Sequence, residues 1–203
     1  MCQLSSAFEM QRGCLRELRR AQRLISAALF ATLSLCMPMA RATTLARMDV
    51  RALAQHSAYV ARVRCVQVAT VTDANLVWTL STFELTEPWK GNPPPRFAVR
   101  MPGGQAAGLR VTVEGAPRFA AGEDVVLFLT EDRAHHMNIV SWAQGTFRIR
   151  KNPRTAVERA VQDTAGLHLL DPHSGARAEG ERRQLSLAAL RASVARALEE
   201  TAR

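Results

Sequence analysis

Apolar and polar side chains alternate in short stretches through the middle of the chain, and each stretch ends at turn residues. A period of two places every second side chain on one face of an extended strand. The stretches that follow this pattern are residues 59–70, 76–87, 97–101, 109–114, 124–130, 137–142 and 145–151. Turns rather than helices separate them, which is typical of an antiparallel sandwich or barrel. We therefore predict a mainly β fold, with about six or seven strands in a small closed barrel.

Helical periodicity occurs before and after this strand-rich segment in the sequence. Residues 49–58 place Val50, Leu53 and Ala54 on one face. Residues 187–198 carry an apolar stripe at intervals of three and four, preceded by Ser186 as a candidate N-cap. We predict that this second, amphipathic helix packs on the barrel; the alternative is a helix that covers a membrane surface or a partner.

The amino terminus contains the three regions of a secretory signal peptide in their usual order. Five arginines between residues 12 and 23 precede an uncharged apolar run over residues 24–39, and Ala40-Arg41-Ala42 follows. The run has 16 residues, and a membrane-spanning helix needs about 20. We predict cleavage between Ala42 and Thr43, and a periplasmic or secreted mature protein that meets the membrane only through its transient signal peptide.

This reading divides the chain into four parts. They are a signal peptide (1–42), a barrel domain (43–151), an irregular loop region (152–185) and the carboxy-terminal helix (186–203). The loop assignment follows from Gly166, Pro172 and Gly175, which leave room for one or two short extended pieces. Both Met1 and Met10 fit as the start of the signal peptide.

Cleavage would leave Cys65 as the single cysteine of the mature chain. Alternation with Arg62 and Arg64 places Cys65 on the apolar face of its strand. We therefore predict a free, buried thiol and a fold without an internal disulfide.

The formal net charge of +9 raises the question of nucleic-acid binding. Only Lys90 and Lys151 are lysines among the 27 basic residues, and the chain has 33 alanines. An excess of both arginine and alanine is what a GC-rich codon supply produces, whatever the function. The mature chain also lacks a basic stripe interleaved with aromatic residues, as single-strand binders require. Nucleic acid is therefore not an expected partner.

Two segments carry a family resemblance. Residues 57–91 contain SAYVARVRCVQV and LSTFELTEPWKG, which close on Lys90-Gly91, and residues 115–131 read GAPRFAAGEDVVLFLTE. These segments resemble netrin-like domains, which include the amino-terminal domains of tissue inhibitors of metalloproteinases, and exported bacterial proteins of uncharacterised function. The resemblance covers about residues 49–150 and implies an OB-like barrel. The inhibitors chelate zinc through an amino-terminal cysteine, which the expected start at Thr43 lacks, so inhibition is not implied.

Four residues are candidates for contact with a ligand: Trp78, Trp89, His135 and His136. Tryptophans can rim a binding surface, although closing the ends of the barrel is the role that we favour for them. The adjacent histidines fall in a polar link between two strands, where solvated side chains are common. A metal site there would need two to four convergent ligands, and a weak alternative loop contains His168, Asp171 and His173.

No pattern of catalytic residues, cofactor site or metal site is predicted from the sequence. The expected function is a non-catalytic binding or interaction module, whose partner is an unknown envelope protein or a small ligand. One alternative is an envelope hydrolase that depends on a metal, or on His135, His136 or His168 together with a nearby carboxylate. A second alternative is a structural envelope protein.

Overall fold

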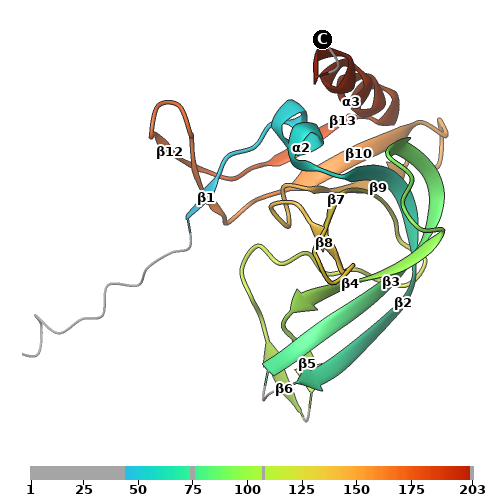
Figure 1. Cartoon of the computed structure of the whole chain (residues 1–203), viewed down its shortest axis with the longest axis vertical. Coiled ribbons are helices and arrows are strands. Elements are labelled where there is room, and N and C mark those ends of the chain that lie inside the picture. Colours follow the sequence, from blue (N-terminus) through green and yellow to red (C-terminus); the bar gives the residue numbers. More distant parts are fainter. Residues whose placement is uncertain (1–43, 74–75, 107, 202–203) are drawn as a thin grey trace, which may run out of the picture. The chain divides into compact units, whose positions relative to one another are not determined.

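The structure is a computed structural model that describes residues 44–73, 76–106 and 108–201 (Figure 1). The expected signal peptide and its cleavage site at Ala42 and Thr43 lie outside these residues. The fold is mainly β, with 51% strand and 14% helix, which confirms the predicted class. No helix of the described part is long and apolar enough to cross a membrane.

Five strands close into a barrel. They are β2 (Tyr59–Asp73), β3 (Leu76–Lys90), β4 (Arg96–Pro102), β7 (Asp124–Glu131) and β8 (Met137–Ile139). The ring runs β7–β2–β3–β4–β8 and returns to β7. Its closure between β4 and β8 is parallel, with Val99 beside Met137, and the other pairings are antiparallel. The ring therefore has fewer strands than the six or seven expected, and is not wholly antiparallel.

The remaining strands lie outside this ring. They are β1 (Thr44–Ala46), β5 (Gly104–Ala106), β6 (Leu109–Val111), β9 (Thr146–Lys151), β10 (Glu158–Asp163), β11 (His168–Leu170), β12 (Arg177–Glu179) and β13 (Arg182–Ser186). Strands β9, β10 and β13 extend the barrel sheet from β7, whereas β5 and β6 form a separate hairpin. The expectation of a loop over residues 152–185 is wrong, because this segment holds four strands. The predicted strand over residues 109–114 is reduced to β6.

Two apolar cores form on the two faces of the barrel wall. The inner core fills the barrel and includes Cys65, Phe83 and Leu127. Cys65 is 0% exposed, as its alternation predicted, and burial raises the pKa of its thiol. The outer core lies between the wall and the helices, and includes Val60 and Phe128.

Both predicted helices are present and belong to the outer core. They are α2 (Val50–His56) and α3 (Leu187–Thr201). Of the predicted stripe of α3, Leu190 and Val194 are buried and Leu187 and Leu198 are partly buried, and Ala197 is buried beside them. This burial confirms that the helix packs on the domain. The hydroxyl of Ser186 accepts a hydrogen bond from the backbone N–H of Ala189 at 3.1 Å, as expected of an N-cap.

Candidate functional site

Lys90 and Gly91, which carry part of the family resemblance, have a structural role. The ammonium of Lys90 donates hydrogen bonds to the carbonyls of Ala54 at 2.7 Å and Ser57 at 2.6 Å. It thereby satisfies carbonyls that the carboxy-terminal end of α2 leaves without partners. Partial burial lowers the pKa of Lys90. Gly91 has φ +66°, and a Cβ there would lie 2.7 Å from the carbonyl oxygen of Ala58. The pair therefore fixes the end of β3 against α2.

Beside this junction, a groove of about 470 Å³ lies between the outer face of the barrel and the start of α3. We call it the Trp89 groove. Its chemistry comes from one indole and five charged side chains: Trp89, Arg62, Glu87, Lys151, Glu158 and Arg191. Its volume falls within the range typical of ligand pockets, about 300–1,000 Å³.

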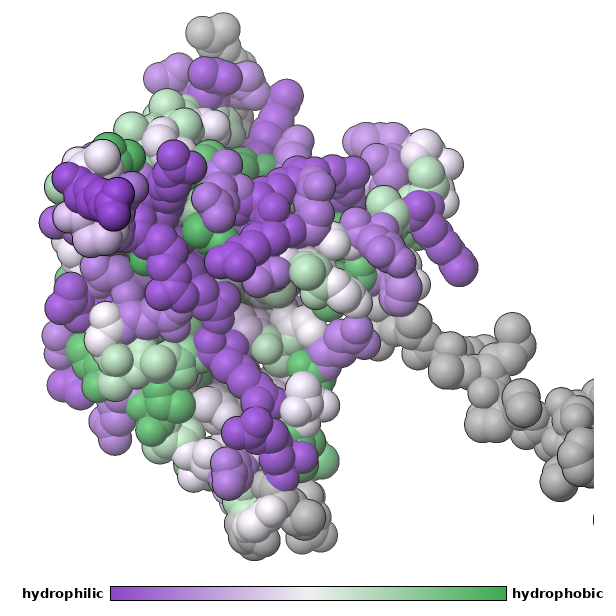
Figure 2. Space-filling model, turned by 180° about the vertical axis from the view of Figure 1, so that it is seen from behind, coloured by the Kyte–Doolittle hydropathy of each residue, from purple (hydrophilic) through white to green (hydrophobic). Residues whose placement is uncertain are grey.

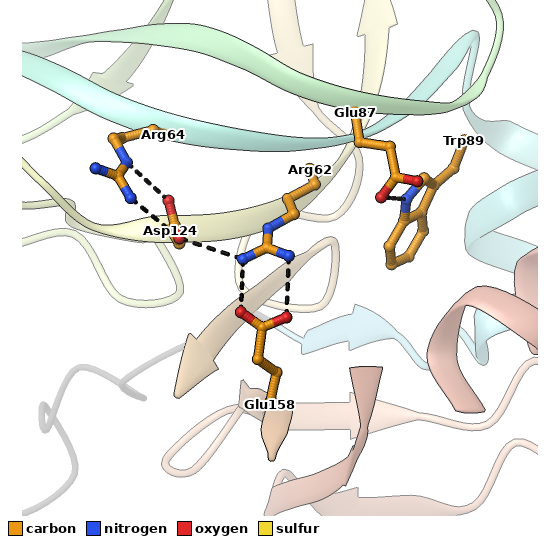
Figure 3. Close-up of polar contacts among 6 residues, drawn as sticks. All are labelled: Arg62, Arg64, Glu87, Trp89, Asp124 and Glu158. Carbon is orange, nitrogen blue, oxygen red and sulfur yellow. Dashed lines mark hydrogen bonds and ion pairs between the residues drawn. The ribbon is translucent and has the colours of Figure 1, made fainter. Parts of the chain in front are cut away.

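Arg62 is the centre of a charged network on the wall of this groove (Figure 3). Its two terminal nitrogens donate to the carboxylate of Glu158 at 3.0 and 2.8 Å, and one of them lies 3.3 Å from Asp124. Asp124 also accepts from Nε of Arg64 at 3.0 Å. Only 18% of the Arg62 side chain is exposed, and the hydrogen bond to Glu158 raises its pKa. A bidentate pair holds the guanidinium in one orientation.

A second set of contacts fixes the indole. Nε1 of Trp89 donates to one oxygen of Glu87 at 3.0 Å, and a guanidinium nitrogen of Arg191 lies 2.7 Å from the other oxygen. Glu87 belongs to β3 and Arg191 to α3. The groove therefore presents an aromatic ring whose orientation is set by the barrel and the helix together.

Trp78 lies outside this groove, near the opposite end of β3. The guanidinium carbon of Arg100 is 4.1 Å from the centre of the Trp78 ring, a cation–π distance. Arg100 in turn lies 2.7 Å from the carboxylate of Asp73. The sequence analysis predicted both Trp78 and Trp89 as candidates for contact with a ligand, but the structure does not bring them into one site.

His135 and His136, the two histidines predicted as candidates for ligand contact, lie in the exposed turn between β7 and β8. Nδ1 of His135 is 2.6 Å from Glu131, and Nδ1 of His136 is 3.2 Å from Asp132. Glu131 also accepts from the hydroxyl of Tyr59 at 2.8 Å. The hydrogen bonds from His135 and Tyr59 lower the pKa of Glu131. Each histidine thus contacts the carboxylate four residues before it, Glu131 at the end of β7 or Asp132 in the turn, away from the Trp89 groove.

The loop weighed as a weak alternative metal site has a local structural function. Asp171 accepts hydrogen bonds from the backbone N–H groups of His173 and Ser174, at 3.0 and 2.8 Å, and these bonds stabilise the turn and lower the pKa of Asp171. Within the described residues, no three histidine, cysteine, aspartate or glutamate side chains gather as a metal site would require.

Sequence reasoning identified Trp89 but missed its charged neighbours. Arg62 and Glu158 are 96 positions apart, and a strand periodicity shows only that Arg62 points away from the inner core. No protein-family model matches the chain, and no curated protein matches it.

Proposed function

We propose that the mature chain is a non-catalytic binding module, periplasmic or secreted, which binds an envelope protein through the Trp89 groove. The observation that carries this proposal is the convergence of one tryptophan and two arginines in one groove. Tryptophan and arginine are enriched among the residues that contribute most to protein–protein binding. Here Trp89, Arg62 and Arg191 are already oriented by carboxylates, which reduces the entropy lost on binding.

We also propose that the barrel is OB-like and related to netrin-like domains. Two features support this assignment: the five-stranded ring, and the parallel closure of an otherwise antiparallel ring. The Lys90-Gly91 junction supports it as well, because those residues belong to the shared pattern. The fold leaves the ligand open, since related barrels bind peptides, sugars and nucleic acids.

Export is the part of the proposal that rests on residues 1–42. Amino-terminal sequencing of the protein purified from its source should read Thr-Thr-Leu-Ala-Arg, beginning at Thr43. Full-length chain retained in the cytosol would contradict both the cleavage and the location.

The binding role is tested by affinity capture from an envelope extract, with residues 43–203 as bait. Trp89→Ala and Arg191→Ala should each reduce the amount of a captured protein, by about 30-fold for a residue worth 2 kcal/mol. The matched control is Arg110→Ala, an exposed arginine on β6 outside the groove. Capture that is unchanged in both groove variants would contradict the assignment, as would equal losses in the control.

A further inference from the structure

The β2–β3 hairpin extends beyond the part of β2 that pairs with β7, and one backbone edge of β2 is unpaired there. On the other side of the hairpin, β3 still pairs with β4 from Trp78 onward. We define the arm as residues 66–73 of β2 and 76–81 of β3. Strand β2 pairs with β7 from Tyr59 to Arg64, and Cys65 still bonds the backbone of Glu123 and Gly122. Beyond Cys65, β3 is the only strand of the described chain that pairs with β2. Every second residue of this stretch therefore turns its N–H and C=O groups to an open edge.

The arm is also where apolar surface gathers. Five large apolar side chains are exposed in the described part of the chain, and four belong to the arm or to the β5–β6 hairpin that packs beside it. These four are Val68, Val71, Leu76 and Val111. Figure 2 shows some of the green, apolar side chains of this view in the lower half of the molecule, where Figure 1 places β5, β6 and the adjoining ends of β2 and β3; others lie in the upper half.

Charge distinguishes the arm from the rest of the protein. Asp73 is its single charged residue, and Arg100 neutralises it at 2.7 Å. The mature chain of residues 43–203, in contrast, carries a net +5, so two copies repel each other over much of the remaining surface. The arm is a surface on which two copies can meet without like charges facing each other. It also lacks the lysine, proline or inward-pointing charge that commonly protects an edge strand.

We propose that two copies of the chain associate through their arms, with β2 pairing antiparallel to β2 across a two-fold axis at Thr70. This register places Val68 opposite Thr72 of the second copy, and Ala69 opposite Val71. Cross-strand pairs of β-branched residues stabilise a sheet. Because each edge is used once, the pairing closes as a dimer and does not propagate into a fibre. The interface is separate from the Trp89 groove and does not depend on the proposed function.

The test is the mass of residues 43–203 by sedimentation equilibrium over a dilution series. The wild type should approach twice the monomer mass at high concentration. Val68→Lys should weaken the dimer by about tenfold or more, because the new charge lies on the interface. The matched control is Val157→Lys, since Val157 is 49% exposed and Val68 39%; it should leave the dimer unchanged.

A double variant tests the register. In Val68→Lys/Thr72→Glu, each lysine lies opposite a glutamate of the second copy, so the dimer should recover most of the lost affinity. Residues 68 and 72 are too far apart along one extended strand to pair within a copy. A wild type that is monomeric at every concentration would overturn the proposal, as would a Val68→Lys variant that dimerises normally. Failure of the double variant to recover would overturn the register at Thr70.

Discussion

The two ends of the β2–β3 hairpin have the same strand periodicity but different surroundings. Near Val60 the outer face of β2 is buried by α2, α3 and the extended sheet, and the side chains there form the outer core. Near Val71 the outer face is solvent-exposed, and one edge of the strand has no partner. The change occurs close to the register shift between Cys65 and Gln67, a β-bulge or irregularity of the kind that bends a strand.

The two ends of the hairpin therefore differ in role: one contributes to the stability of the fold, and the other is available for interaction. The end near Val60, which we call the covered end, buries side chains on both faces of the barrel wall. Its apolar residues therefore contribute to folding. The end near Val71, which we call the bare end, keeps valine and leucine side chains exposed, where they contribute little to a monomer. Such surfaces commonly serve in association. The following predictions test this contrast, beginning with the largest expected effect.

Removal of α3 should have the largest effect on stability. Ending the chain after Ser186 uncovers the outer core that Leu190, Val194 and Ala197 contact. Covering one apolar side chain contributes roughly 1.5–3 kcal/mol, so the loss should approach the whole stability of a domain, about 5–15 kcal/mol. The measurement is chemical unfolding of the truncated chain. An unchanged midpoint and solubility would show that α3 serves a partner or a membrane instead.

A matched pair of leucine substitutions compares the two ends directly. Leu190 is 0% exposed at the covered end, and Leu76 is 58% exposed at the bare end. Leu190→Ala should lower the free energy of unfolding by about 2–5 kcal/mol, because it leaves a cavity. Leu76→Ala should change it by less than about 0.5 kcal/mol. Urea unfolding of dilute samples measures both, and similar values would remove the distinction between the ends.

A matched pair of arginines extends the comparison to charges. Arg62→Met leaves Glu158 without its cation in a half-buried site, while Asp124 keeps Arg64. It should cost about 1–3 kcal/mol. Arg100→Met removes an exposed ion pair and one cation–π contact, and should cost less than about 1 kcal/mol. Unfolding midpoints at low and high salt measure both effects. A larger loss for Arg100 would mean that the bare end is held by electrostatics.

Cys65 marks the boundary between the two ends. Its thiol is fully buried, so Cys65→Ala should cost on the order of 1 kcal/mol. Reductant should not change thermal unfolding of residues 43–203, because no second cysteine remains. Rapid reaction of the native protein with a bulky thiol reagent would contradict the burial.

The smallest expected effect concerns the exposed turn between β7 and β8. The folded protein holds the pKa of Glu131 below its ordinary value of 4.5, through His135 and Tyr59. The resulting stabilisation is therefore complete above that ordinary value, and is lost as the pH falls through the lowered pKa. Glu131→Gln should make the acid side of the stability–pH curve slightly shallower. An identical curve would show that the turn contributes nothing to folding.

Sequence periodicity predicted elements whose local pattern is unambiguous. Residues 59–70 and 187–198 each showed one period, and both elements formed. Strands β10 to β13 were missed because they are short, largely polar and interrupted by Gly166, Pro172 and Gly175. Their pairing with β9 and with one another depends on backbone hydrogen bonds that no side-chain pattern reports.

The site was less predictable than the fold. Trp89 was identifiable as a large aromatic residue near a turn, whereas the Arg62–Glu158 pair joins elements 96 positions apart. Alternation likewise gives each strand two faces without showing which face another element will cover. Val60 is buried and Val71 is exposed because of tertiary packing. The local sequence contains no signal for this difference in burial.

The most direct test of the contrast is native-state hydrogen exchange along β2, measured on peptides from residues 59–65 and 66–73 at low and high protein concentration. In dilute solution, the amides of residues 59–65 should be strongly protected, and the outward amides of residues 66–73 should exchange fast. At high concentration only the second set should slow, because the second copy covers that edge. Equal protection of the two peptides, or no dependence on concentration, would contradict the account.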